Sequence, residues 1–106
     1  MPFATFSALP GKSPFAGITG HYVHLDRMTC GEVDLVAGTI LPSHQHPHEQ
    51  VTYVISGRFE FTVGPETRIL EPGMAAVIPG NTLHAGRTLT ACRVLDVFSP
   101  VREDYR

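Results

Sequence analysis

The stretch GTILPSHQHPHEQVTYVISG, residues Gly38 to Gly57, decides how the rest of the chain is interpreted. It places His44, His46 and His48 two residues apart. In an extended chain, side chains two residues apart lie on the same face. Imidazole nitrogens arranged in this way can bind one divalent metal ion, such as zinc, nickel, manganese or iron. The stretch therefore predicts an ordered metal site inside a β-structure.

Short runs of apolar and β-branched residues continue on both sides of this stretch, separated by turn residues. Ser56-Gly57 is typical of a tight hairpin, and Phe59 and Phe61 alternate with polar residues after it. No segment has a sustained helical period with caps. The sequence thus predicts a single-domain, all-β sandwich or barrel. The expected strands cover residues 21–29, 32–38, 39–46, 51–57, 58–64, 67–70, 74–78, 82–86 and 90–98.

The composition limits which kinds of partner and which cellular location the protein is expected to have. The chain has 106 residues, 42% of them hydrophobic, which suits one domain with one core. A formal net charge of −2 supplies no basic field for nucleic acid or an anionic membrane. No apolar run approaches the roughly 18 residues of a membrane span, and the first residues do not resemble a secretory signal. We therefore expect a cytoplasmic protein, with Cys30 and Cys92 as small buried side chains rather than a disulfide framework.

The two ends of the chain differ from its middle. Residues 1–20 are rich in proline and glycine, which predicts an arm that precedes a barrel spanning residues 21–106. The arm carries three phenylalanines that favour burial, so we expect it to dock on the barrel or on a second copy of the chain. The polar ending REDYR is expected to lack regular structure.

Two further residues are candidates for the metal site. Gln50 begins an expected strand in the same phase as the histidines and can offer an amide oxygen. His84 follows the turn at residues 79–81, which could return it to the same end of the barrel. Pro47 bends the chain before His48, so that histidine is a ligand, a supporting group or a substrate-facing group.

Asp96 and Arg102 are candidates for proton transfer and for anion binding. Asp96 lies between apolar residues, and burial inside the barrel would raise its pKa and suit it to proton transfer. The alternative is a surface aspartate or one paired with an arginine. Arg102 could hold a carboxylate in a bidentate way, although the residues beside it, Glu103 and Asp104, favour a solvated arginine.

The spacing of the first stretch resembles the first sequence motif of cupins. The matching positions are Gly38, His44, His46, Gln50 and Gly57. Cupins usually have glutamate where this chain has Gln50. The substitution makes the expected site less anionic than a site with a carboxylate ligand.

A second stretch resembles the second cupin motif. The matching positions are Gly73, Pro79 and His84, while Asn81 and Thr88 replace the usual glycine and asparagine. The resemblance implies a cupin-type double-stranded β-helix, or jelly-roll barrel, that pairs with a second copy into a homodimer. It also implies a divalent metal held by His44, His46, Gln50 and His84.

A narrower resemblance is to the small cupins of pectin and alginate breakdown, the KdgF type. It runs from HPHEQVTYVISGRFEFTVG through VIPGNTLH to LDVFSPVREDY. It implies an enzyme that opens unsaturated uronic acid monosaccharides into linear keto sugars. Asp96, Phe98 and Arg102 stand where that group lines its active site. Asp96 would move the proton, with His48 or water as substitutes, and Phe98 would pack against the sugar.

Three other functions use the same barrel. They are an iron-dependent cupin dioxygenase, an isomerase like the polyketide cyclases, and a non-catalytic module that binds a small molecule. Dependence on O₂ would indicate the first, and a larger aromatic cavity the second. A chain without DNA-binding helices argues against a sensor domain of a regulator.

Overall fold

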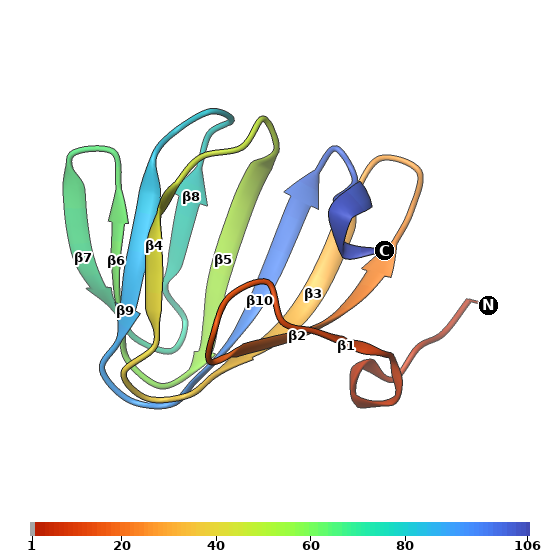
Figure 1. Ribbon diagram of the computed structural model, residues 1–106, viewed down its shortest axis with the longest axis horizontal. Helices are drawn as coiled ribbons and strands as arrows, with labels where there is room; N and C mark the ends of the chain where they lie inside the picture. The colour runs from red at the N-terminus through yellow and green to blue at the C-terminus, as the bar shows by residue number, and fades with distance from the viewer. Residues whose placement is uncertain (1) are drawn as a thin grey trace.

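The computed structural model describes residues 2–106 and consists of two antiparallel sheets (Figure 1). One sheet has six strands in the order β1-β2-β3-β10-β5-β8, and the other has four in the order β4-β9-β6-β7. Non-consecutive neighbours such as β10 and β3 show that the chain crosses repeatedly between the sheets, as in a jelly roll. The strands are β1 (Gly11–Lys12), β2 (Ile18–His24), β3 (Thr29–Leu35), β4 (Ile40–His44), β5 (Glu49–Ser56), β6 (Phe59–Val63), β7 (Glu66–Leu70), β8 (Ala75–Ile78), β9 (His84–Thr88) and β10 (Cys92–Ser99).

The sheets face one another because their strands alternate buried and exposed residues. On β6, Phe59 and Phe61 are buried, while Glu60 between them reaches Arg87 on the outer side. Gly86 on β9 gives the Phe59 ring its space, since a Cβ at that position would lie 2.5 Å from the ring. The expectation of an all-β fold is therefore confirmed, and the alternation expected around Phe59 and Phe61 places both rings inside.

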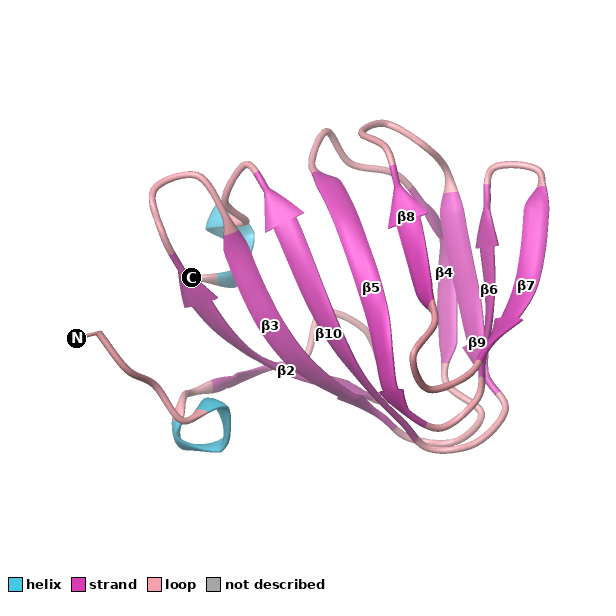
Figure 2. Ribbon diagram, turned by 180° about the vertical axis from the view of Figure 1, so that it is seen from behind, coloured by secondary structure: helices cyan, strands magenta, loops and turns pink. Residues whose placement is uncertain are grey.

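The hydrophobic core lies between the two sheets. Figure 2 shows the sheets from behind, joined by short loops at both ends. Both sheets contribute side chains to the core, and the polar groups described below lie at one end of the barrel, where Phe98 and Ile78 flank Gln50. Its members are Ile18, Tyr22, Val33, Leu35, Val54, Phe59, Phe61, Leu70, Ala76, Ile78, Cys92, Val94 and Phe98.

One expected strand is wrong in its extent. Residues 21–29 do not form a single strand, because β2 ends at His24 and β3 begins at Thr29. The backbone N–H of Leu25 donates to the carbonyl oxygen of Met28 at 2.9 Å and closes a hairpin turn between the two strands. The apolar residues on both sides of this turn concealed it in the sequence.

The first 20 residues contribute to the six-stranded sheet. β1 pairs with β2, and a short 3-10 turn, η1 (Phe6–Ala8), precedes it. Phe15 packs against the core, whereas Phe3 remains exposed. Residues 2–106 contain no helix long and apolar enough to cross a membrane.

Candidate metal centre

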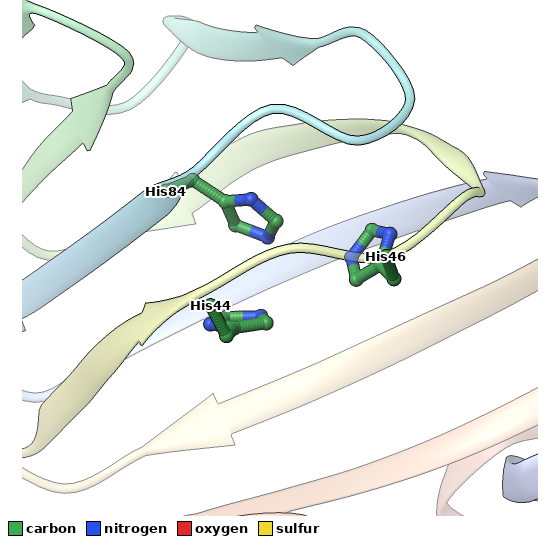
Figure 3. A group of neighbouring side chains, drawn as sticks. All are labelled: His44, His46 and His84. Carbon is green, nitrogen blue, oxygen red and sulfur yellow. The ribbon is translucent and has the colours of Figure 1, made fainter.

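Three histidines converge at the open end of the barrel (Figure 3). His44 ends β4 and His84 begins β9, and these two residues are register partners in the four-stranded sheet. His46 follows in the loop after β4 and turns back toward them. One ring nitrogen from each lies within 4.8 Å of the others. This spacing is compatible with a single divalent metal ion, which imidazole nitrogens bind at about 2.0–2.1 Å.

Hydrogen bonds to backbone carbonyls fix which nitrogen of each ring is free. The Nδ1 of His44 lies 2.8 Å from the carbonyl oxygen of Pro42, and the Nδ1 of His84 lies 2.8 Å from that of Thr82. A carbonyl can only accept, so both Nδ1 atoms donate, which leaves the Nε2 of each ring as the nitrogen available to a metal. Ligating histidines are commonly oriented in this way.

The environment of His84 gives the strongest indication of a bound cation among the three histidines. Its side chain is 1% exposed, and its Nε2 is buried with no hydrogen-bond partner among residues 2–106. Burial lowers the pKa of His84 to about 4, which keeps the ring neutral. A buried acceptor without a partner costs free energy, and a bound cation would satisfy it.

Gln50, at the start of β5, completes the group. Its Oε1 lies 3.0 Å from the Nε2 of His46, whose Nδ1 donates to the carbonyl oxygen of His48 at 3.0 Å. In the neutral ring both facing atoms are therefore acceptors, and acceptors meet at this distance when a proton or a cation lies between them. Burial lowers the pKa of His46, which favours the neutral ring. The residues present thus fit a divalent cation with three imidazoles and one amide oxygen.

Asp96 faces the same space from β10. It lines a cavity of about 50 Å³, together with two of the histidines and several aromatic rings. Its Oδ1 accepts a hydrogen bond from the hydroxyl of Thr52 at 2.7 Å. Loss of solvent around the carboxyl raises the pKa of Asp96 to about 6, against the opposing effects of that hydrogen bond and of Arg102. A carboxyl with such a pKa can accept and return a proton near neutral pH.

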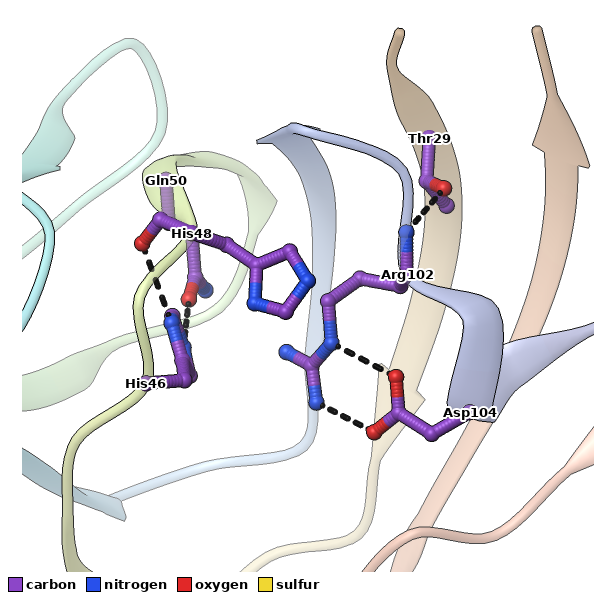
Figure 4. A network of polar contacts seen from close by, with 6 residues as sticks. All are labelled: Thr29, His46, His48, Gln50, Arg102 and Asp104. Atoms are coloured by element: carbon purple, nitrogen blue, oxygen red, sulfur yellow. Dashed lines mark hydrogen bonds and ion pairs between the residues drawn. The ribbon is translucent and has the colours of Figure 1, made fainter. Parts of the chain in front are cut away.

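Arg102 lines this cavity rather than lying in solvent, and Figure 4 shows its guanidinium turned toward Asp104. Its guanidinium carbon lies 4.8 Å from the centroid of Phe98 and 4.0 Å from that of Tyr105, in the corner formed by two rings that are nearly perpendicular to one another. The Nε and Nη2 of Arg102 donate hydrogen bonds of 3.0 and 2.8 Å to the carboxylate of Asp104. The backbone N–H of Arg102 donates to the hydroxyl of the buried Thr29.

These contacts correct two expectations for the C-terminus. The ending does form a turn, η2 (Glu103–Tyr105), and the arginine is 8% exposed. The sequence favoured a solvated arginine because it showed only the neighbouring acids. It did not show that Phe98 and Tyr105 would enclose the guanidinium. The bidentate geometry expected for a substrate carboxylate is occupied by Asp104.

His48 lies outside the three-histidine group. Its ring centroid is 5.4 Å from that of His46, and its carbonyl oxygen orients the His46 ring. Its Nδ1 is buried and has no partner among the described residues. Figure 4 shows its ring away from the contact between His46 and Gln50.

The cavity also has walls that sequence reasoning missed. Thr52 follows Gln50 by two residues, so strand alternation alone would have placed it on the same inner face. Tyr22 packs against Tyr105 with ring centroids 4.8 Å apart, and Phe15 of the arm lies 5.4 Å from His44. No short-range pattern links these aromatic residues, because they meet only through the tertiary fold.

Comparison with protein families gives a match over most of the barrel. Residues 31–98 match the model described as the cupin domain. This range contains all four candidate ligands together with Asp96 and Phe98.

Two curated relatives have similar sequences. An uncharacterized protein of Streptomyces coelicolor is 36% identical over 74 residues, which are 69% of this chain and 70% of that protein. Dimethylsulfoniopropionate lyase DddQ of Ruegeria pomeroyi is 32% identical over 87 residues, which are 81% of this chain but only 39% of the lyase.

Among solved structures, KdgF from a Halomonas species has a similar fold and a related sequence. It is 31% identical with a TM-score of 0.91, and the superposition covers 100% of this chain and 99% of KdgF. The likeness therefore extends over the whole barrel and both ends of the chain.

Proposed function

Because this chain belongs to the cupin domain family, we propose that it is a metal-dependent enzyme that converts unsaturated uronic acid monosaccharides into linear keto sugars. The observation that carries the proposal is Asp96, a carboxyl with a raised pKa that lines the same cavity as His44 and His84, two of the three clustered histidines. The similarity to KdgF over the full chain supports this substrate class.

The metal would be held by His44, His46, Gln50 and His84. When bound, a divalent ion supplies a positive charge that polarises sugar oxygens and stabilises negative charge on them. The reaction involves no net oxidation, so it sets no redox requirement on the metal. The residues themselves contribute three ring nitrogens and one amide oxygen in a fixed arrangement.

Asp96 would carry the proton in both halves of the reaction. It removes the proton of the anomeric hydroxyl as the bond between the anomeric carbon and the ring oxygen breaks. This leaves an aldehyde at one end and an enolate at the other. Asp96 then returns the proton to the carbon of the enolate, which gives the ketone. The product is an isomer of the substrate, and the carboxyl ends as it began.

Arg102 and Phe98 would position the substrate at the mouth. Arg102 presents a guanidinium that packs against two aromatic rings, a suitable partner for the uronate carboxylate once Asp104 is displaced. Phe98 is buried next to it and offers an apolar surface to the sugar.

The test is an assay of the metal-loaded protein on the unsaturated galacturonate monosaccharide, following the loss of ultraviolet absorbance by the enol. We expect turnover by the wild type and a loss of at least about 100-fold for Asp96→Asn, the range of general acid–base catalysis. Asp34→Asn, an exposed aspartate on β3, is the matched control and should retain activity. No turnover by the metal-loaded wild type, or full activity of a folded Asp96→Asn variant, would contradict the proposal.

A lyase is the second candidate, favoured by the 32% identity to dimethylsulfoniopropionate lyase. A base near a divalent metal also suits proton abstraction next to a carboxylate. Incubation with dimethylsulfoniopropionate, followed by NMR of the remaining substrate, separates the two candidates.

We also propose that the protein is a homodimer joined through the outer face of β10, β5 and β8. Val97, Val51 and Val77 are neighbours in register across these strands, and Val77 is 71% exposed. Tyr53 and Ile55 extend the same apolar face. Such a face favours burial against an identical copy.

Light scattering on the purified protein tests the dimer. Val77→Glu should convert it to a monomer, and Val36→Glu, at an exposed valine after β3, should not. A monomeric wild type would contradict the proposal.

A further inference from the structure

A one-way chain of hydrogen bonds runs through the buried side of the candidate metal centre. The hydroxyl of Thr52 donates to Oδ1 of Asp96 at 2.7 Å. The Nε2 of Gln50 donates to the same hydroxyl oxygen at 2.9 Å and lies 3.5 Å from Oδ1 of Asp96. A threonine hydroxyl has one proton, and here that proton is donated in the hydrogen bond to the carboxylate of Asp96. Thr52 can therefore only accept from Gln50.

This direction decides how the amide of Gln50 is turned. Its NH₂ group must face Thr52, so its Oε1 must face the opposite side, where it lies 3.0 Å from Nε2 of His46. A reversed amide would bring Oε1 against the oxygen of Thr52 and point N–H donors at the histidines. An N–H donor cannot bind a cation, so the reversed amide would remove one ligand.

We propose that Thr52 is the positioning residue of the metal centre, and that together with Asp96 it fixes the amide of Gln50 so that oxygen faces the cation. Thr52 is 2% exposed, so water does not compete for its hydroxyl. Partners outside the ligand set commonly orient the ligands of a metal in this way. The inference rests on metal binding by the proposed site and not on which substrate is converted.

The same contact explains why glutamine is suitable at this position. A glutamate at position 50 would place a second carboxylate about as close to Asp96 as the 3.5 Å that now separates the amide nitrogen from Oδ1. Like charges at that distance repel, whereas the amide donates. Gln50 can therefore serve the metal on one side and the carboxyl of Asp96 on the other.

The experiment measures zinc affinity of the metal-free protein by competition with a chromophoric chelator. Thr52→Val keeps the shape of the side chain but removes the hydroxyl, and we expect affinity to fall about 10- to 100-fold, the range for such supporting groups. Thr52→Ser restores a hydroxyl and should bind zinc within a few-fold of the wild type. Thr88→Val is the matched control, because Thr88 is also buried and hydrogen-bonded but contacts Thr39 and Val36.

Each outcome decides the proposal. It stands if only Thr52→Val loses affinity, and it is overturned if that folded variant binds zinc as tightly as the wild type. It is also overturned if Thr52→Ser or Thr88→Val loses as much affinity, since the hydroxyl at position 52 would then have no specific role. If Thr52→Val does not fold, Thr52→Ala takes its place with the same expected loss. A wild type that binds no zinc would refute the metal centre itself, whereas normal zinc binding without turnover of uronates would refute only the proposed reaction.

Discussion

The two ends of the barrel interior are built from the same strands but differ in composition: the closed end is apolar, whereas polar side chains join apolar ones at the mouth. On β5 the inward side chains run from Val54 at the closed end through Thr52 to Gln50 at the mouth. On β10 they run from Val94 to Asp96. The register places Val94 opposite Val54 and Asp96 opposite Thr52. Val94 therefore faces an apolar residue and Asp96 a polar one, while Phe98, the next buried side chain of β10, lies opposite Gln50.

This difference separates the source of stability from the source of chemistry. The closed end buries rings and branched side chains, whose removal from water favours folding. The mouth buries a carboxyl, an amide and an imidazole, which cost free energy unless they are satisfied. We therefore expect changes at the two ends to have separable effects on unfolding and on metal binding.

The largest effect on stability should come from the closed end. Phe59→Ala removes a ring that is 2% exposed and leaves a cavity against Gly86. We expect the free energy of unfolding to fall by about 3–5 kcal/mol. Urea unfolding of the metal-free protein measures this. If Phe59→Ala lowered the free energy of unfolding by less than His84→Ala does, the contrast between the two ends would be wrong.

Removal of the metal should have the next largest effect. A ligand that binds only the folded state at 100 times its dissociation constant stabilises it by about 2.7 kcal/mol. Adding a chelator to the zinc-loaded wild type should therefore lower the melting temperature. An identical melting temperature with and without zinc would show that the four residues bind none.

His84→Ala should change metal binding much more than stability. In the metal-free protein the lost packing is partly offset by deletion of a buried acceptor without a partner, so we expect a loss of about 1 kcal/mol. Zinc should no longer raise the melting temperature of this variant. His21→Ala, at a histidine that contacts Leu9 outside the group, should respond to zinc like the wild type.

The smallest effect is expected outside both ends. Asp34 and Arg93 form an exposed ion pair at 2.8 Å on the outer face of the six-stranded sheet. Asp34→Asn should change the free energy of unfolding by at most about 1 kcal/mol, since exposed ion pairs contribute little. Zinc affinity should be unchanged, and a clear loss would mean that the outer face also supports the mouth.

The sequence predicted those parts that depend on local spacing. Strand alternation placed Phe59 and Phe61 inside, and the spacing of His44 and His46 brought two imidazoles together. The resemblance to cupin motifs brought in His84, which lies 38 residues after His46. Strand alternation accounts for the two phenylalanines, whereas His46 lies in the loop after β4 and meets the other imidazoles through that loop, not through the two-residue repeat of a strand.

The environment of Arg102 could not be predicted in this way. The enclosure of its guanidinium needs Phe98 from β10 and Tyr105 from the last turn, while Thr29 from β3 holds its backbone. The distance of 73 residues between Thr29 and Arg102 leaves no local pattern. The raised pKa of Asp96 likewise depends on burial by distant segments.

The neutrality of the candidate ligands has a consequence for what the mouth will attract. Three imidazoles and an amide bring no negative charge to a divalent cation, and Arg102 and Asp104 cancel one another. Among these groups, Asp96 offsets part of the positive charge of the metal. The rest of the negative charge that balances the metal has to come from the bound small molecule. The barrel should therefore bind small anions from solution and release neutral molecules.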